Sequence, residues 1–408
     1  MTSLSAVTTA PPRPLRFGLS EFGGALGDLG TLLPLAAALI TVNGMEATGV
    51  FLTVGLAYIV AGLYFRLPIP VQPLKAVAAI AIATGLSGGV VSAAGPILGI
   101  VLLALAASGL APALGRLFAR PVVRGIQLGL GLLLIQTGLL LAARPQLVPA
   151  GGESVVKLGE VALPLGLPVA ALVGFVLSRR SGIGRVPSTL AALGLGVVVS
   201  LFGGAFDGLS SLRLGVVLPA LALPTTHDLG IAAVLLVVPQ IPLTLANSVV
   251  ATKRTAEDHF GLDAKRVTYR SLLTSMGLLN LLAGLIGGLP VCHGSGGLTA
   301  HYRFGARTGG SSLMIGGLLI ALAVFVDGNV VPLLALIPYP VLGALLVFTG
   351  VQHGLLARDV RGVQEVAVAG AVAVVGFATG NLALGFGLGL ALEAVLRLRG
   401  RPLLRQSI

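Results

Sequence analysis

The chain has 408 residues, of which 55% are hydrophobic and 10% are charged. Soluble domains carry about 25% charged residues, so this composition excludes a water-soluble globular protein. In a soluble protein the formal net charge of +12 would favour nucleic acid as a partner. In a membrane protein the basic residues must first be considered as signals for the orientation of the helices.

The amino-terminal stretch is rich in proline and arginine and lacks the apolar region of a signal peptide. We expect residues 1–16 to form a short cytoplasmic tail. Fourteen apolar segments follow, and with their flanks they reach the roughly 20 residues that cross a bilayer. They span residues 17–42, 46–65, 70–86, 90–114, 121–143, 162–178, 187–205, 228–250, 268–288, 291–306, 311–326, 331–350, 364–380 and 382–397.

The basic residues indicate how these segments are oriented. With the amino terminus inside, all but four of the 26 lysines and arginines lie in or beside cytoplasmic loops. The exceptions are Arg144, Lys157 and Arg213 in outside loops and Lys75 within a segment. This pattern predicts a multi-pass protein of the cell (inner) membrane with both termini in the cytoplasm, and it explains the net charge without nucleic acid.

Two segments at corresponding positions of the two halves are interrupted. Residues 68–75 read PIPVQPLK and residues 289–297 read LPVCHGSGG, with their Pro-Val pairs 220 positions apart. Proline cannot continue a helix, so the first stretch should run extended and start a short helix near Pro73. In the second stretch the glycines permit close approach to a ligand, and Ser295 can cap the new helix.

Both interruptions should therefore present a helix amino terminus inside the membrane, as transporter folds built from two inverted halves do. Free N–H groups and partial positive charge at such ends suit an anion. The alternative is that proline and glycine merely kink two packed helices.

Intramembrane polar residues support an anion site. Lys75 lies about one turn into the first broken helix, where an uncompensated cation costs about 2.5–3.5 kcal/mol. A bound dianion would compensate it, and the alternative is an ion pair with Asp28. Gln72 and His293 flank the two breaks and can donate hydrogen bonds to an oxyanion, although His293 could equally be a satisfied interior residue.

The eighth segment carries a polar stripe that could line a pathway or join helices by hydrogen bonds. It comprises Gln240, Thr244, Asn247 and Ser248. Because protonation neutralises an intramembrane carboxylate, Asp28 and Glu21 are the first candidates for proton coupling.

The sequence contains no P-loop, zinc-ligand cluster, nucleophile with a base or dinucleotide fingerprint, so we expect neither an enzyme nor a cofactor. The single cysteine, Cys292, excludes an internal disulfide and argues against a cysteine-based metal site.

The chain resembles the molybdate transporter type-1 family, a branch related to the sulfate permease superfamily. The resemblance spans nearly the whole chain. The motifs that carry it are GDLGT at 27–31, PIPVQPLK at 68–75, PQIPLTLANS at 239–248, CHGSGG at 292–297 and YRFGART at 302–308. It implies fourteen helices arranged as two inverted seven-helix repeats, with the anion between the third and tenth helices.

The same resemblance implies a core domain of segments 1–4 and 8–11 and a gate domain of segments 5–7 and 12–14. The corresponding boundaries are 17–115 and 225–327 for the core and 116–210 and 328–400 for the gate.

The sequence departs from the sulfate permeases in two respects. They usually add a soluble cytoplasmic regulatory domain, whereas we expect only a short tail to follow the last segment here. They also tend to carry a Ser-Arg pair early in the tenth helix, where this chain has Gly297, Leu298 and Thr299. The positive charge of the site can instead come from Lys75.

We therefore predict a secondary transporter of molybdate that alternates access by moving core against gate. The predicted substrate-binding residues are Gln72, Pro73, Lys75, Thr244, Asn247, His293, Gly294, Ser295, Gly296 and Gly297. A membrane potential of roughly 100 mV, negative inside, opposes uptake of a dianion by about 4.6 kcal/mol. Cotransport of protons or another cation is therefore expected. A sulfate transporter and an anion channel on the same fold are the alternatives, and the sequence leaves open whether the protein is a homodimer.

Overall fold

We describe the fold from a computed structural model of the chain. The structure describes residues 14–408 with the following exceptions: 112, 114–117, 149–150, 159–160, 180–187, 204, 206–208, 211, 213–214, 326–330, 401–402 and 404–408. Residues 1–13 of the predicted amino-terminal tail are therefore not among the described residues. The same holds for Arg213, which was predicted in an extracytoplasmic loop, and for most of the carboxyl-terminal tail.

The chain is mostly helical, and each of the fourteen predicted segments contains helix. In the first half the helices are α1 (Leu19–Ala25), α2 (Leu29–Thr41), α3 (Ala47–Phe65), α4 (Lys75–Thr84), α5 (Gly88–Ser108), α7 (Arg120–Ala142), α8 (Gly166–Ser178) and α9 (Ser188–Phe202). In the second half they are α11 (Thr226–Ile231), α12 (Val238–Leu243), α13 (Thr252–Phe260), α14 (Tyr269–Leu285), α15 (Ser295–Arg303), α16 (Gly310–Phe325), α17 (Val331–Leu334), α18 (Tyr339–Leu355), α19 (Val363–Ala378) and α20 (Leu382–Leu398).

Short tight or wide helical turns connect several of these helices. They are η1 (Leu26–Asp28), η2 (Ala232–Val237), η3 (Thr244–Ala251), η4 (Gly261–Arg266) and η5 (Leu356–Asp359).

Six helical stretches among the described residues are long and apolar enough to cross a membrane by length and composition. They are Leu19–Thr41, Ala47–Phe65, Gly88–Ser108, Arg120–Ala142, Thr226–Arg266 and Tyr339–Asp359. Shorter apolar helices, including α4, α8, α16 and α19, pack among them.

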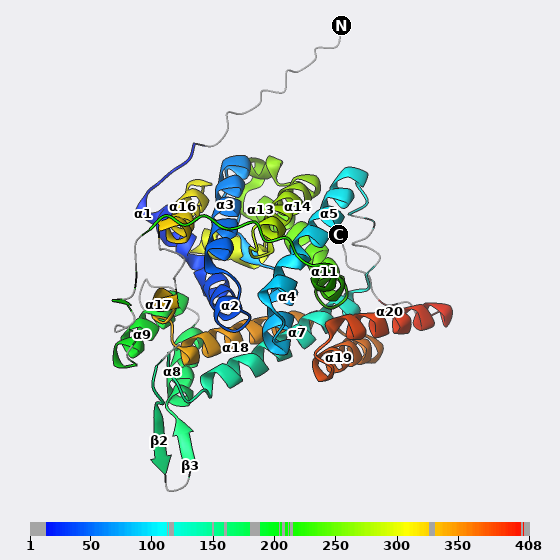
Figure 1. Cartoon of the computed structure of the whole chain (residues 1–408). Coiled ribbons are helices and arrows are strands. Elements are labelled where there is room, and N and C mark those ends of the chain that lie inside the picture. Colours follow the sequence, from blue (N-terminus) through cyan, green and yellow to red (C-terminus); the bar gives the residue numbers. More distant parts are fainter. Residues whose placement is uncertain are drawn as a thin grey trace.

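The helices form two layers (Figure 1). The first layer comprises α1–α5 and α11–α16, with α3 packed on α16 and α5 packed on α14. The second layer comprises α7–α9 and α17–α20, with α7 packed along α18. Glycines let these backbones approach closely, since a Cβ on Gly131 of α7 would lie 2.6 Å from the carbonyl oxygen of Gly350 of α18. The layers meet where α4 contacts α7 and α2 contacts α18.

The two interrupted stretches meet inside the first layer. Strand β1 (Gln72–Pro73) pairs antiparallel with β4 (Val291–Cys292), with Gln72 opposite Cys292 and Pro73 opposite Val291. Helices α4 and α15 begin two to three residues beyond these strands. Both stretches are therefore true breaks, and the interpretation of simple kinks is wrong.

The carbonyl groups of the first break find donors in the second half of the chain. The ring Nδ1 atoms of His293 and His301 each lie 2.9 Å from a carbonyl oxygen, and the Ser312 hydroxyl donates to a third at 3.2 Å. The three acceptors are the consecutive residues 68–70. These contacts satisfy extended backbone that neither water nor lipid would satisfy at this depth.

Three predicted boundaries need correction. The first short helix begins near Pro73 as predicted, but Lys75 is its first residue rather than one turn inside it, because Pro73 is held in β1. The segment predicted at 162–178 begins as strand β3 (Val161–Pro164), which forms a hairpin with β2 (Val155–Leu158). The segment predicted at 331–350 is divided near Pro338, and its long helix α18 continues to Leu355.

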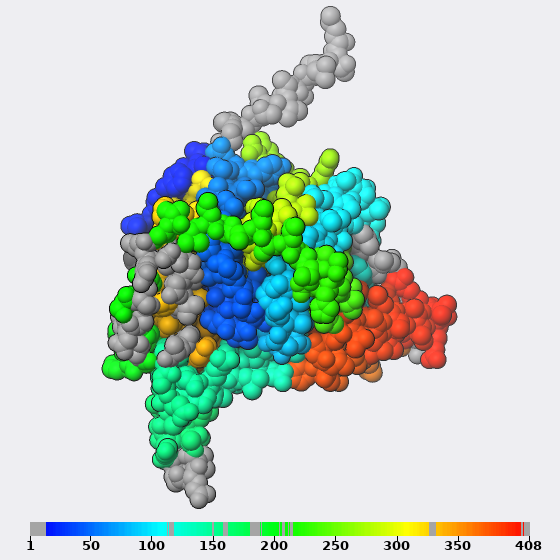
Figure 2. All heavy atoms as spheres, in the orientation of Figure 1, coloured from blue at the N-terminus to red at the C-terminus, as the bar shows by residue number. Residues whose placement is uncertain are grey.

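An extended strap, residues 215–225, runs over the outside of the first layer, where Figure 2 shows it in green across α2, α3 and α14. Its backbone donates to the ends of two helices: Val217 N to Val324 O at 2.9 Å and Ala222 N to Leu285 O at 3.0 Å. Its exposed side chains include Val216, Leu218 and Leu221. This strap joins the second layer back to the first.

The eighth segment is not a regular helix. Pro239 and Pro242 lie in α12, between the wide turns η2 and η3, because proline removes the N–H groups that a regular ladder needs. The widened turn η3 carries Asn247 toward the meeting point of the two breaks.

Candidate functional site

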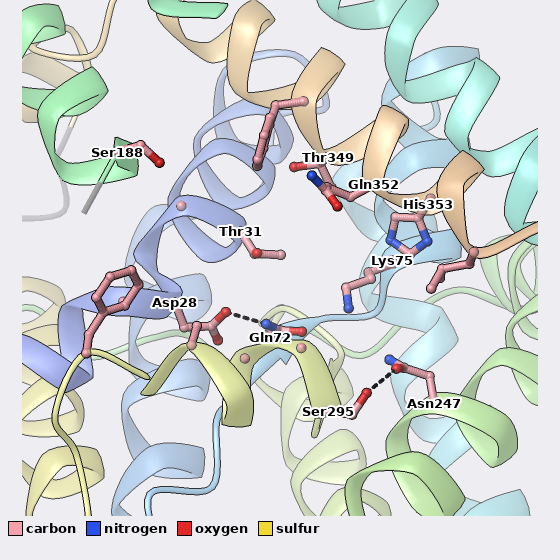
Figure 3. A pocket seen from close by; sticks show the side chains of 18 residues that line it. Asp28, Thr31, Gln72, Lys75, Ser188, Asn247, Ser295, Thr349, Gln352 and His353 are labelled. Atoms are coloured by element: carbon pink, nitrogen blue, oxygen red, sulfur yellow. Dashed lines mark hydrogen bonds between the residues drawn. The ribbon is translucent and has the colours of Figure 1, made fainter. Parts of the chain in front are cut away.

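A cavity of about 410 Å³ lies between the two layers at the ends of the broken helices (Figure 3). From the first layer its polar lining consists of Asp28, Thr31, Gln72, Lys75, Asn247 and Ser295, beside Gly296 and Gly297. From the second layer it consists of Ser188 on α9 and Thr349, Gln352 and His353 on α18.

The amino terminus of α4 is already capped. The amide oxygen of Gln240 accepts from the backbone N–H groups of Ala76 at 2.9 Å and Val77 at 3.4 Å. The amide nitrogen of Gln240 donates to Thr244 Oγ1 at 3.0 Å. The expectation of free N–H donors at both broken helices is therefore wrong for α4.

What α4 offers the cavity is the ammonium group of Lys75. The ion pairs found among the described residues involve other groups, and no hydrogen bond found there uses this side chain. Its Nζ lies 3.6 Å from where a Cβ on Gly294 would be, so the cation sits beside the start of α15. The predicted alternative, a direct pair with Asp28, is absent from the described part of the chain.

The amino terminus of α15 keeps its donors. Gly294 is the N-cap residue and has no side-chain cap, so the predicted capping role of Ser295 is wrong. The Ser295 hydroxyl instead donates to Asn247 Oδ1 at 2.9 Å. The first N–H of the helical ladder is that of Leu298, which leaves the N–H groups of residues 295–297 without intrahelical acceptors.

The carboxylate of Asp28 closes one side of the cavity. It is 2% exposed, and its Oδ1 accepts a short hydrogen bond from the Gln72 amide nitrogen. Its Oδ2 has no hydrogen-bond partner among the described residues. A group that can hold or release a proton thus lies in the wall opposite an unpaired cation.

Several residues predicted to bind substrate lie behind this wall. Pro73 is paired in β1, and Thr244 is fully buried against Gln240. The His293 ring is enclosed by Pro70 O at 2.9 Å and Ser275 Oγ at 2.8 Å, which matches the interior reading of this residue.

Two further predicted residues are held by the backbone around them. Gly294 contributes only its backbone at the N-cap of α15. Glu21, a coupling candidate, accepts the backbone N–H groups of Arg307 and Thr308 at 3.0 and 3.2 Å and does not line the cavity.

Helix α18 contributes residues to the cavity that the sequence did not predict. Thr349, Gln352 and His353 lie at helical spacing on the face that lines the cavity. Two of them fell beyond the predicted end of the twelfth segment at residue 350. A glutamine and a histidine side by side after an apolar run were the signal that could have revealed them.

Chemically the cavity combines an unpaired ammonium group, free backbone N–H groups and neutral amides, which together suit an oxyanion. No group of three His, Cys, Asp or Glu side chains that could hold a metal occurs in the described ranges.

The family model described as "Molybdate transporter of MFS superfamily" matches residues 20–134 and 232–352, more than half of the chain. The chain belongs to the molybdate transporter family. Curated relatives of this family member include molybdate transporter 2 of Arabidopsis thaliana, 32% identical over 93% of this chain and 88% of the relative. Molybdate transporter 1 of Chlamydomonas reinhardtii is 31% identical over 91% of this chain and 90% of the relative.

Solved structures agree on the fold of this family member. The transmembrane domain of the cyanobacterial bicarbonate transporter BicA superposes with a TM-score of 0.65 at 17% identity, covering 91% of this chain and 98% of that one. Murine Slc26a9, an anion transporter captured in the inward-facing state, gives 0.68 at 14% identity over 95% and 69%. The chain is thus a multi-pass membrane protein of a transporter family and not an enzyme.

Proposed function

We propose that the protein is a secondary active transporter that carries molybdate, as the dianion, across the cell membrane. The observation that carries the proposal is the unpaired Lys75 ammonium group beside the free N–H groups of α15, in a cavity between two layers. The names of the curated relatives favour molybdate over sulfate.

Proton coupling is supported by the position of Asp28. An ionised carboxylate in the cavity wall repels a dianion, whereas a protonated one can donate a hydrogen bond to it. Proton and anion therefore favour each other's binding. The coupling also helps to offset the membrane potential, which opposes a dianion by about 4.6 kcal/mol at roughly 100 mV.

The packing supports fourteen segments in two inverted repeats. If the halves correspond as predicted, the contact of α5 with α14 maps onto that of α16 with α3. In the same way, the contact of α19 with α7 maps onto that of α8 with α18. We assign the first layer to the core domain and the second to the gate, with the cavity at their sliding surface.

We infer that the cavity opens toward the side that the basic residues mark as cytoplasmic. Ser188 at the start of α9, Phe304 just after α15 and Leu356 just after α18 line it. Arg303 and Arg358 stand beside two of these residues in sequence, and such residues remain inside. These positions support an inward-open arrangement with both termini in the cytoplasm.

The decisive experiment is uptake of radiolabelled molybdate into proteoliposomes that contain the purified protein. We expect uptake that saturates, is stimulated by an acidic exterior and is competed less strongly by sulfate than by unlabelled molybdate. Current in a planar bilayer far above transporter turnover would favour the channel instead.

Replacing Asp28 with asparagine should uncouple the transporter. Asparagine resembles the protonated acid, so Asp28→Asn should exchange molybdate within about threefold of the wild-type rate while losing the stimulation by a pH gradient. The measurement is uptake with and without an inwardly directed proton gradient.

Glu21→Gln is the matched control, because Glu21 is equally buried, at 3% exposure, yet lies outside the cavity. An amide oxygen can still accept the N–H groups of Arg307 and Thr308, so this variant should keep the stimulation. Stimulation retained in Asp28→Asn would refute the assigned proton carrier.

A further inference from the structure

Helix α18 presents unpaired polar groups to the cavity from the second layer. The Gln352 amide makes no hydrogen bond to a described residue, and its side chain is exposed to the cavity. The His353 ring is buried at 9% exposure, and its Nδ1 has no hydrogen-bond partner among the described residues. Buried polar atoms are normally paired, so this occluded ring nitrogen lacks a partner that a ligand could supply once the ring or the layers move.

These two side chains face the first layer across the cavity. Figure 3 shows His353 beside Lys75 and Gln352 pointing into the open space. Lys75 and His353 also both line a small neighbouring cavity that reaches Gln127 of α7. By contrast, the Thr349 hydroxyl is already committed, because it donates to Leu345 O at 2.8 Å.

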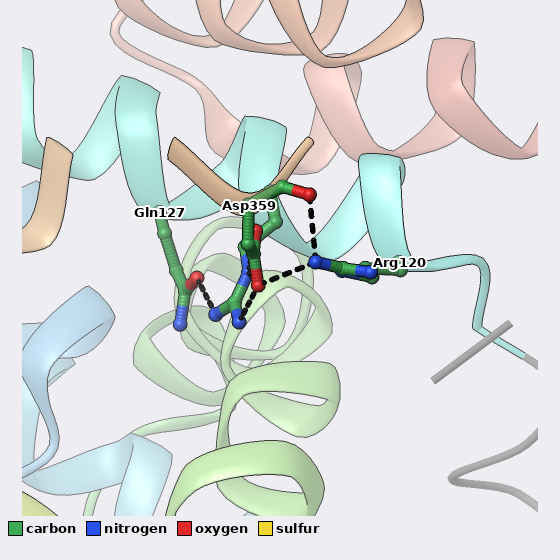
Figure 4. A network of polar contacts seen from close by, with 4 residues as sticks. Arg120, Gln127 and Asp359 are labelled. Atoms are coloured by element: carbon green, nitrogen blue, oxygen red, sulfur yellow. Dashed lines mark hydrogen bonds and ion pairs between the residues drawn. The ribbon is translucent and has the colours of Figure 1, made fainter. Parts of the chain in front are cut away.

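The end of α18 is fixed in place by a cluster of charges (Figure 4). The Asp359 carboxylate in η5 accepts from Arg124 of α7 at 2.6 and 3.0 Å and pairs with Arg120 at 2.9 Å. Arg124 also donates to Gln127 at 2.8 Å. These contacts therefore hold the end of α18, which carries Gln352 and His353, in a fixed position against α7.

We propose that Gln352 and His353 complete the oxyanion site from the gate, so that one bound anion contacts both layers. This inference rests on the proposed function. A tetrahedral anion points its oxygens in four directions, and Lys75 with the N–H groups of α15 covers one side of it. The opposite oxygens accept from the Gln352 amide and from the N–H of a neutral His353 ring.

An anion bound in this way links the moving parts. Within the 410 Å³ cavity a small anion leaves room for water, so direct contact with both layers requires them to approach. Substrate then stabilises the closed arrangement over the open one by the contacts that only closure makes. A larger anion spans the gap at a wider separation than a smaller one, so these residues also tune the preference for molybdate over sulfate.

The test compares variants of the full-length protein in proteoliposomes, with uptake of molybdate and of sulfate measured for each. Gln352→Leu and His353→Phe keep side-chain volume but remove the donors. Each should raise KM for molybdate about tenfold or more and shift the ratio of molybdate to sulfate uptake. His353→Gln restores a donor and should recover most of the loss.

Val351→Ala is the matched control on the same helix, because Val351 is 42% exposed and does not line the cavity. It should leave KM and the selectivity ratio unchanged. Wild-type KM and selectivity in Gln352→Leu, which lies in open space and does not disturb packing, would overturn this inference while the proposed function stands. A wild-type protein that takes up neither anion would overturn the proposed function, and this inference with it.

Discussion

Replacing Lys75 with alanine should abolish molybdate uptake while leaving the protein at least as heat-stable as the wild type. The ammonium group lies in the cavity without a hydrogen-bond or ion-pair partner among the described residues, so it destabilises the empty protein. A bound dianion is its compensating charge. Truncating one member of a desolvated charge pair costs about 2–5 kcal/mol, which corresponds to about 30-fold or more in affinity.

Two measurements separate this role from a structural one. Uptake by proteoliposomes reports the lost substrate contact, and thermal unfolding reports the fold. Because Cys292 is the single cysteine and is 2% exposed, a thiol-reactive fluorescent dye follows unfolding directly. If Lys75 mainly paired with a carboxylate, its removal would lower the unfolding temperature.

Lys253→Ala is the control for charge as such. Lys253 pairs with Glu257 four residues later on α13, away from the cavity, and surface pairs of this kind contribute little. Its removal should leave both uptake and unfolding temperature near wild-type values. Normal uptake by Lys75→Ala would refute the assigned anion contact.

The positions of the helices and of both breaks could be predicted from the sequence, because they depend on local chemistry. Runs of apolar residues define the segments, and the prolines at 68–73 and at 290 keep the two breaks extended. Gln72, Lys75 and Gly297 were also found this way, since polar and small residues stand out in an apolar chain. Whether they bind substrate stays a prediction.

The partners of these residues could not be predicted, because they come from distant parts of the chain. Nothing local indicates that the Gln240 side chain caps α4, more than 160 residues earlier. Likewise, no local feature indicates that the His293 ring turns away from the cavity and reaches a carbonyl of the first break. The contribution of the second layer could not be predicted because the apolar run of the twelfth segment ends near residue 350, whereas α18 continues to Leu355 and carries Gln352.

A methyl group on Gly297 should damage the site, whereas the same group on Gly296 should be tolerated. A Cβ on Gly297 would lie 2.6 Å from the Gln72 amide nitrogen and 2.8 Å from Asp28 Oδ2. The Gln72 and Asp28 side chains are hydrogen-bonded to each other, so neither can move away without breaking this bond. Apart from its chain neighbours and the backbone of α15 itself, a Cβ on Gly296 would meet no atom within 4 Å.

Comparing Gly297→Ala with Gly296→Ala separates the effect of the added methyl group on packing from its effect on helix propensity. Both residues are in the first turn of α15, where alanine favours the helix over glycine by up to about 1 kcal/mol in either variant. Overpacking costs about 1–3 kcal/mol, so only Gly297→Ala should unfold at a lower temperature and bind molybdate about tenfold more weakly. Equal behaviour of the two variants in dye-monitored unfolding and in uptake would show that α15 does not need to approach Gln72 and Asp28 closely.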